Sequence, residues 1–384
     1  MTLTLITLSA LAAWIYLTFF RGGYWRADQR LRDGKLPTHW PDVVVVIPAR
    51  DEEATIGVAV KSHLGYGYSG SLTVILADDG STDATVERAK EAAKGQVREL
   101  DVISVPPLPD GWTGKLWAVH NGLLRAKEIA PDAKYALLTD ADIAMAHGAT
   151  RRIVAKAERD NFALTSLMAR LDARGAWGGL LIPAFIYFFQ MLYPFPRAND
   201  PTDNLAAAAG GCMLVRMDAL EAIGGIESIK GELIDDCALA RAIKDISPST
   251  KIWLGLANRD AVSMRDNQSL SSIWDMVART AYAQLKFSPV LLAGTVASMA
   301  LIYLTPPLAA LTVGWHGNIS VAALGFAAWG LMARSYRPTL ELYDRPAWES
   351  FTLPVVAMIY SAMTISSALR HRRGEGGQWK GRTY

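Results

Sequence analysis

Three acidic clusters supply the chain's best candidates for chemistry. They are Asp78-Asp79, Asp140-Ala141-Asp142 and Asp235-Asp236. The first two come directly after apolar runs typical of strands, so their carboxylates are expected at the carboxyl edge of a parallel sheet, where open α/β folds bind ligands. Hard cations prefer oxygen ligands, and Mg²⁺ commonly bridges carboxylates to phosphate oxygens. The clusters therefore predict a site for a divalent cation and a phosphorylated substrate.

Asp140 and Asp142 form a D-x-D pair directly after the apolar run 135–139. Alternate residues of an extended segment face the same side, so both carboxylates can converge on one ion. That ion, Mg²⁺ or Mn²⁺, would neutralise a diphosphate leaving group. Lone D-x-D pairs are common in sequences, but the strand before this one and the second acidic cluster favour the functional interpretation.

The other two clusters each have a structural alternative. Asp78 and Asp79 could form an Asx turn that caps the next helix, but two adjacent aspartates exceed what capping needs, so we expect one of them to contact a nucleotide. Asp235 and Asp236 could simply cap a helix over 237–243. In the functional interpretation one of these two is a general base, and crowding of the carboxylates raises one pKa and strengthens that base.

Two basic residues are candidates for phosphate binding. Lys115 comes after Gly111-Trp112-Thr113-Gly114 and precedes a predicted helix, so it could pair with phosphate at the helix amino end. The P-loop spacing is absent, and an aromatic anchor in a surface loop is the alternative. Arg279 comes just before an apolar stretch, where an arginine could pair with a diphosphate or with lipid headgroups.

The chain around these residues has a βαβαβ pattern. The run 43–49 is apolar without alternation, as expected of a strand buried on both faces. The small apolar run 206–215 predicts backbone passing close to a ligand. The pattern predicts a doubly wound α/β domain of the nucleotide-binding kind. Strands are expected over 43–49, 72–77, 100–105 and 135–139, and helices from 50–53 onward, over 84–93 and over 115–130.

Composition points to a protein that is partly embedded in a membrane. Of the 384 residues, 51% are hydrophobic and 20% are charged, and the mean hydropathy is +0.15. This is too apolar for an ordinary soluble enzyme. The net charge of only +2 gives no reason to expect a nucleic-acid partner. The two cysteines, Cys212 and Cys237, do not resemble a disulfide framework or a metal site.

The apolar excess lies at the two ends. Residues 3–20 are long enough to cross a bilayer, and the arginines after them predict that their side is cytoplasmic. A cleaved signal peptide is the alternative, but no positive charge precedes the stretch and no small-residue cleavage site comes after it. We therefore expect an uncleaved anchor over 1–21.

Three more apolar stretches, 288–315, 319–333 and 353–369, predict a membrane region over 288–370, with a basic tail over 371–384. If all three cross, the tail lies outside, against the positive-inside tendency. A kinked or re-entrant segment would keep the tail cytoplasmic, as we expect. The aromatic stretch 177–195 is broken by prolines and is either an interfacial helix or a buried core helix.

Taken together, the motifs resemble inverting family 2 glycosyltransferases with the GT-A fold. The resemblance covers about residues 43–285 and rests on residues 47–53, 78–83, 114–115, 139–142 and 235–236. Residues 111–118 and the tail Trp379-Lys380-Gly381-Arg382 are similar to the hopene-associated glycosyltransferases of bacterial hopanoid clusters. Carotenoid and ceramide glycosyltransferases are more distant.

The resemblance implies a role for each motif. Asp140 and Asp142 would hold the diphosphate through Mg²⁺ or Mn²⁺, and Asp236 would deprotonate the acceptor. Where the family usually has Glu-Asp, this chain has Asp235-Asp236, so which of the two acts stays open. The ceramide-type Gln-x-x-Arg-Trp motif is absent, and Arg279-Thr280-Ala281-Tyr282 takes its place. The residues implied to hold the nucleoside are Pro48, Ala49, Arg50, Glu52 and Asp79.

We therefore expect a GT-A nucleotide-sugar-binding domain over 40–285, cytoplasmic at a bacterial inner membrane, between N- and C-terminal transmembrane helices. It would move a sugar from a nucleotide-diphosphate sugar, with a UDP-sugar as first choice, to a hydroxyl of a membrane lipid, with a hopanoid or other isoprenoid as first choice. A polyprenyl-phosphate sugar synthase and a ceramide-type glucosyltransferase are alternative enzymes. An inactive membrane scaffold is the alternative outside enzymes.

Overall fold

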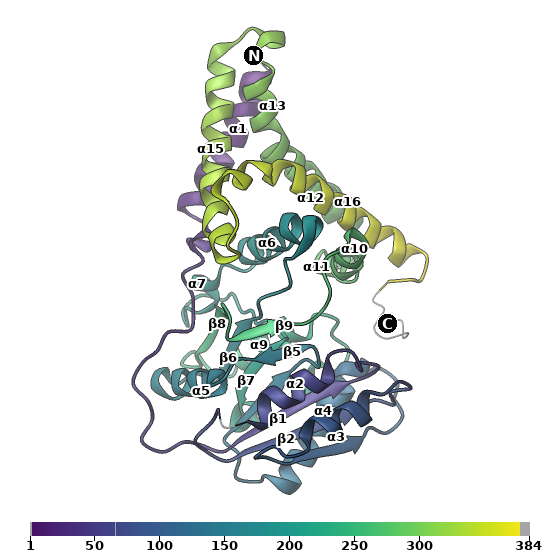
Figure 1. Ribbon diagram of the computed structural model, residues 1–384. Helices are drawn as coiled ribbons and strands as arrows, with labels where there is room; N and C mark the ends of the chain where they lie inside the picture. Colours follow the sequence, from purple (N-terminus) through teal and green to yellow (C-terminus); the bar gives the residue numbers. More distant parts are fainter. Residues whose placement is uncertain (1, 66, 377–384) are drawn as a thin grey trace.

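The computed structural model describes residues 2–65 and 67–376 (Figure 1). The tail motif Trp379-Lys380-Gly381-Arg382 and most of the predicted basic tail lie outside the described residues.

A seven-stranded sheet forms the centre of the α/β domain, in the order β3-β2-β1-β4-β7-β6-β8. β1, β2, β3 and β4 are parallel, and β6 is parallel to β8, whereas β7 runs antiparallel to both of its neighbours. The four strands that the sequence predicted are parallel, as expected, whereas β7, which was not predicted as a strand, runs back from the edge at which the acidic clusters lie. The strands are β1 (Val43–Ala49), β2 (Leu72–Asp78), β3 (Leu100–Ser104), β4 (Tyr135–Thr139), β6 (Leu164–Met168), β7 (Cys212–Arg216) and β8 (Ile252–Leu256).

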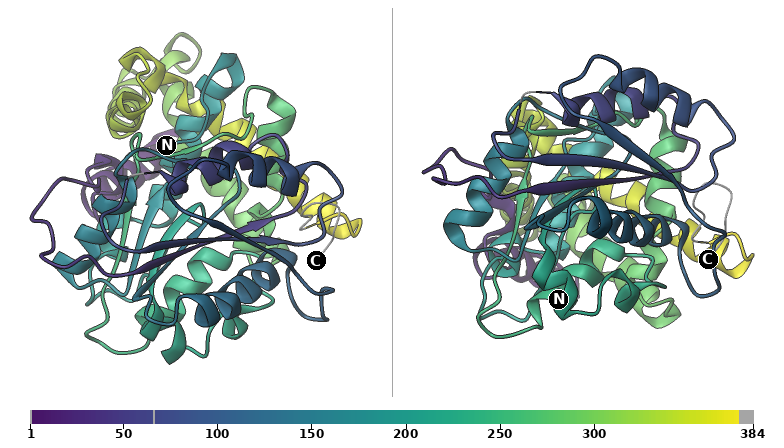
Figure 2. Two further views of the ribbon diagram at one scale, coloured as in Figure 1. Left: turned by 60° about the horizontal axis from the view of Figure 1, so that its bottom comes forward. Right: turned by 90° about the horizontal axis from the view of Figure 1, so that it is seen from below.

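Helices cover both faces of this sheet (Figure 2). Within β1, Val43, Val45 and Ile47 belong to the hydrophobic core on one face, and Val44 and Val46 to the core on the other. Burial on both faces explains why this run shows no polar alternation. The first face is covered by α2 (Ile56–Leu64), α3 (Thr85–Ala93) and α5 (Ala149–Asp160), and the second by α4 (Gly114–Ile129), α8 (Met217–Ala222) and α9 (Asp235–Lys244).

The first helix after β1 begins later than expected, at Ile56 instead of 50–53. Asp51 adopts a left-handed backbone conformation, with φ of 52°, which a helix does not allow. Its carboxylate accepts a hydrogen bond from the backbone N–H of Thr82 at 2.7 Å, and the backbone N–H of Glu53 donates to Asp83 at 3.1 Å. The acidic residues after β1 therefore brace the loop after β2.

A second, two-stranded sheet lies beside the edge of the main one. It pairs β5 (Ile143–Met145) with β9 (Ala261–Ser263) in antiparallel fashion, with Ile143 opposite Ser263. Because β5 begins directly after Asp142, this pairing brings the chain after β9 next to the D-x-D pair. No feature of the local sequence predicted it.

Four helices of the described residues are long and apolar enough to cross a membrane: Thr2–Phe19, Gly175–Leu192, Pro289–Leu311 and Ala347–Arg372. The predicted stretch 319–333 is not among them. It forms most of α15 (Ile319–Leu342), whose second half carries the charged residues Arg334, Arg337 and Glu341. As a whole, α15 packs along α1 (Thr2–Phe19) and α13 (Thr305–Leu311) (Figure 1). Pro306 and Pro307 do not end the apolar segment Pro289–Leu311, because they occupy the first turn of α13, where a missing N–H is tolerated.

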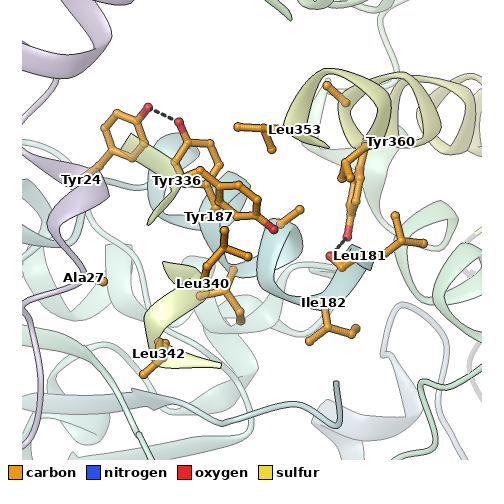
Figure 3. Packing of buried hydrophobic residues seen from close by; sticks show 14 of the residues in the cluster. Tyr24, Ala27, Leu181, Ile182, Tyr187, Tyr336, Leu340, Leu342, Leu353 and Tyr360 are labelled. Atoms are coloured by element: carbon orange, nitrogen blue, oxygen red, sulfur yellow. Dashed lines mark hydrogen bonds between the residues drawn. The ribbon is translucent and has the colours of Figure 1, made fainter. Parts of the chain in front are cut away.

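The aromatic stretch forms one helix, α6 (Gly175–Leu192), with Pro183 inside it. It lies between the seven-stranded sheet and the apolar helices α15 and α16 (Leu353–Arg372) (Figure 1). Figure 3 shows the core that it shares with them, in which the hydroxyl of Tyr360 donates to the carbonyl of Leu181 at 2.9 Å. One side of α6 is therefore part of the core, and the helix joins the α/β domain to the apolar region.

The last helix, α16, returns to the α/β domain. Arg370 of α16 forms an ion pair with Asp275 at 2.7 Å, and the backbone N–H of Tyr282 donates to the hydroxyl of Ser367 at 3.0 Å. The end of α16 is thus fixed to α10 and α11. The remaining helices are α7 (Phe195–Ala198), α10 (Leu270–Ala278), α11 (Ala281–Gln284), α12 (Pro289–Met299) and α14 (Val313–His316).

Candidate active site

A cleft of about 280 Å³ opens at the carboxyl ends of β1 and β4, between the seven-stranded sheet and helices α6 and α10. All three acidic regions contribute to its surroundings, and two of them line it directly. The residues that were singled out from the sequence and that line the cleft are Pro48, Glu52, Lys115, Asp140, Asp142, Asp235, Asp236 and Arg279.

Lys115 joins two of the acidic clusters. Its Nζ lies 3.0 Å from Asp140 Oδ1 and 3.0 Å from Asp235 Oδ2. Burial lowers the pKa of Lys115, but the two carboxylates outweigh that effect and hold its pKa above the ordinary value. Burial likewise raises the pKa of Asp140, against the lowering effect of Lys115. The lysine is therefore a fixed positive charge at the amino end of α4, as a phosphate ligand requires.

Asp142 has two partners that the sequence did not suggest. Its Oδ2 accepts a hydrogen bond from the hydroxyl of Ser263 at 3.0 Å and lies 3.6 Å from Nε of Arg265. Both partners come from the end of β9, which the pairing with β5 places there. Since strand pairing acts over more than 100 residues here, no local motif could have revealed Ser263 and Arg265.

Asp236 lies at the amino end of α9 with its carboxylate turned into the cleft. Its Oδ2 accepts from the backbone N–H of Gly210 at 2.9 Å, and its Oδ1 from that of Cys237 at 2.7 Å. Burial, and then the neighbouring charge of Asp235, raise the pKa of Asp236 to about 6. A carboxylate with that pKa is ionised at neutral pH and is still a stronger base than an ordinary aspartate.

Gly210 explains the small apolar run that precedes β7. A Cβ atom at this position would lie 3.2 Å from Nζ of Lys115 and 3.5 Å from Oδ2 of Asp236. A side chain at this position would therefore press on the tip of Lys115 and contact Asp236, which glycine avoids. Ala209, Gly210 and Gly211 all line the cleft.

The residues at the ends of β1 and β2 lie beside the cleft. Asp79 is 3% exposed, and its Oδ2 lies 3.7 Å from Nη1 of Arg50. Asp78 accepts from the backbone N–H of Ser81 at 3.3 Å and from the Ser81 hydroxyl at 2.5 Å, which is the turn-capping alternative. Ala49, Arg50, Asp78 and Asp79 are not among the residues lining the cleft, so their contact with a nucleotide stays a prediction.

Arg279 lines the cleft from the end of α10. Burial, and then the nearby charge of Arg265, lower the pKa of Arg279. Within residues 2–65 and 67–376 its guanidinium has no ion pair. Two arginines and a lysine thus face the same space as the acidic clusters, an arrangement suited to the oxygens of a diphosphate.

Asp140 and Asp142 are the residues available to a divalent cation. Among the described residues, no group of three or more acidic, histidine or cysteine side chains converges on one point. Mg²⁺ is commonly bound by one or two carboxylates and takes its other ligands from water and substrate phosphates. Lys115 and Arg265 already gather at these two carboxylates, so the pair attracts positive charge. It fits a cation that is shared with a diphosphate.

The family model described as glycosyl transferase family 2 matches residues 44–224. The chain carries a glycosyl transferase family 2 domain. The matched region holds both strand-terminal clusters and Lys115, and the protein is accordingly a glycosyltransferase. The domain built on this sheet, with the acidic pair at the end of β4, has the GT-A fold.

A solved structure shares that fold over almost the whole chain. A mannosyltransferase from Pyrobaculum calidifontis, solved with GDP-mannose and Mn²⁺, is 17% identical with a TM-score of 0.56, and the likeness covers 96% of this chain and 99% of that one. A weaker likeness, with a TM-score of 0.41 at 19% identity, is to glucosyl-3-phosphoglycerate synthase from Mycobacterium tuberculosis, solved with Mg²⁺ and UDP, over 67% of this chain and 86% of that one. No curated protein matches the sequence.

Proposed function

We propose that this family 2 glycosyltransferase moves a sugar from a nucleotide-diphosphate sugar to a hydroxyl of a membrane lipid. One observation carries the proposal: the D-x-D pair and Asp236 open on one cleft, and the opposite wall of that cleft is α6, which packs on the apolar helices. Donor chemistry and access from the membrane therefore meet in the same space.

The donor diphosphate is held from several sides. A Mg²⁺ or Mn²⁺ ion on Asp140 and Asp142 would supply charge neutralisation for the leaving diphosphate. Lys115, Arg265 and Arg279 add fixed positive charge around it. The nucleoside would rest on Pro48, Ala49, Arg50, Glu52 and Asp79, and a UDP-sugar is the donor that we propose.

Asp236 acts as the base. It removes the proton from the acceptor hydroxyl while that oxygen attacks the sugar carbon from the face opposite the diphosphate. The backbone N–H groups of Gly210 and Cys237 fix the carboxylate. Asp235 is instead engaged in an ion pair with Lys115 at 3.0 Å. A single displacement of this kind inverts the anomeric configuration.

The charges in the cleft favour a neutral acceptor. Of the described residues that line it, six are acidic and three are basic. One divalent cation and one diphosphate leave that excess of negative charge in place, so a second phosphate would be repelled. The far wall is apolar, with Leu171, Phe185, Phe189 and Met276. A lipid alcohol suits both features, because its hydroxyl is neutral and its body is apolar. An isoprenoid alcohol such as a hopanoid is our first choice.

We also propose that the catalytic domain and the chain end lie on the cytoplasmic side of a bacterial inner membrane. The arginines after α1 favour this orientation. The ion pair of Arg370 with Asp275 supports a last helix that ends on the same side as α10.

A thermal-shift panel of nucleotide sugars tests the donor. We expect the melting temperature to rise with one UDP-sugar in the presence of Mn²⁺ and to rise much less without it, because the cation links the diphosphate to Asp140 and Asp142. UDP-glucose, UDP-galactose, UDP-N-acetylglucosamine and GDP-mannose form the panel, and free UDP and AMP are the controls. A flat response to every sugar nucleotide would contradict the donor assignment.

The pKa of Asp236 sets a pH dependence. Because a base must be ionised, kcat/KM should fall as the pH drops through about 6, by about tenfold per pH unit below it, and should reach a plateau above it. The measurement is a pH–rate profile with donor held near saturation. A rate that stays constant across that range would argue against an aspartate base.

A further inference from the structure

Asn267 is a buried polar residue in the wall of the cleft that the proposed mechanism does not use. It is 0% exposed and lines the cleft beside Arg265. Neither its Nδ2 nor its Oδ1 has a hydrogen-bond partner among residues 2–65 and 67–376. Buried side-chain amides in folded proteins are nearly always hydrogen-bonded, since an unpaired one is destabilising.

The position of Asn267 associates it with the membrane-facing end of the cleft. Its backbone carbonyl lies against Gly178 of α6, where a Cβ atom would approach to 3.0 Å. The same helix provides Phe185 and Phe189 to the cleft. The proposed nucleoside residues Pro48 and Glu52 come instead from the end of β1. Asn267 is therefore next to α6, on the side of the cleft that we assign to the acceptor.

The chemistry of the amide defines what it can bind. An asparagine side chain offers two N–H donors and one carbonyl acceptor and carries no charge. Such a group pairs with a hydroxyl or a carbonyl and gains little from a phosphate, for which the cleft already has three cations. Phe185 and Phe189 of α6 line the same cleft, and an apolar lipid body would suit them.

We propose that Asn267 recognises a second neutral polar group of the lipid acceptor, next to the hydroxyl that is glycosylated. This inference rests on the proposed function and narrows it: the acceptor is a lipid with at least two oxygen groups at its polar end. A site built to bond an oxygen group rejects a substrate that lacks it, because the buried amide is then left unpaired.

Three alcohols in detergent micelles test the proposal: decan-1-ol, decane-1,2-diol and decane-1,4-diol, with UDP-glucose or GDP-mannose as donor. Wild-type enzyme should use at least one diol about tenfold better than decan-1-ol in kcat/KM. Asn267→Leu, which keeps the volume and removes both polar atoms, should bring that ratio close to one. Hydrolysis of the donor without acceptor should stay unchanged.

Stability separates recognition from a structural role. Because Asn267→Leu removes an unpaired buried amide, its melting temperature should equal or exceed that of the wild type. Asn267→Ala is the second variant should leucine not fit. Thr165→Val is the matched control: the Thr165 hydroxyl is also fully buried and unpartnered among the described residues, but lies in β6 away from the cleft. It should keep the wild-type preference.

Each other outcome has a distinct meaning. Equal use of decan-1-ol and both diols by the wild type, or an unchanged preference in Asn267→Leu, overturns the inference. A parallel change in donor hydrolysis overturns it as well and assigns the amide to the donor sugar. Donor hydrolysis with no transfer to any of the alcohols would instead overturn the lipid-hydroxyl acceptor of the proposed function.

Discussion

Replacing Asp236 with asparagine is expected to lower kcat for sugar transfer by about 10³-fold, because general-base catalysis typically contributes 10²–10⁴-fold. The amide keeps the shape of the side chain, and its single oxygen can still accept one of the two hydrogen bonds that Gly210 and Cys237 donate to the carboxylate, but it cannot take a proton. Donor binding should therefore persist. Single-turnover rates with saturating donor measure the chemical step, and thermal shift measures the binding.

Asp235→Asn is the matched control for that experiment. Asp235 lies 3.0 Å from Lys115, which Asp140 also holds at 3.0 Å. Its loss should weaken donor binding by disturbing the lysine and should reduce kcat far less than Asp236→Asn. The opposite ranking, with kcat lost in Asp235→Asn and kept in Asp236→Asn, would assign the base to Asp235.

Replacing Asp142 with asparagine is expected to remove the effect of Mn²⁺ on donor binding. Even the residues that orient metal ligands typically cost 10–100-fold in metal affinity when mutated, so loss of a ligand should cost at least about 100-fold. Electron paramagnetic resonance of Mn²⁺ in the presence of UDP measures this affinity directly. The melting-temperature rise with the sugar nucleotide should shrink to the value found without metal.

Asp101→Asn is the control for Asp142. Asp101 forms an ion pair with Arg125 at 2.7 Å and does not line the cleft, so its loss should leave Mn²⁺ affinity unchanged. The Asp142 variant also separates the enzyme from an inactive scaffold. A scaffold would keep its cellular function when Asp142 is replaced, whereas a transferase should lose it together with metal-dependent turnover.

The sequence was sufficient to predict the first strands of the sheet and the acidic residues at their ends. β1 and β4 begin and end where the apolar runs 43–49 and 135–139 do. A strand buried on both faces needs an unbroken apolar run, so the first and last residues of that run mark where the strand begins and ends. Parallel strands end at one edge, and this rule brought Asp140 and Lys115 to the same cleft as Pro48.

The start of α2 and the direction of β7 were not predictable in this way. Acidic residues after β1 suit a helix amino end, but bonds to the loop after β2 hold them outside the helix. These bonds join residues about 30 positions apart. The helix preference of a short segment is weak compared with such contacts. It therefore predicted that a helix comes after β1 but not the residue at which that helix begins.

Only the tertiary structure decided the far half of the site. Ser263, Arg265 and Asn267 reach the cleft because β9 pairs with β5 and because the loop after β9 packs on α6. Neither contact leaves a periodic pattern, since each depends on surfaces that meet only after the sheet has formed. Sequence periodicity records which face of an element is buried, while the partner of that face is chosen by the packing of the whole chain.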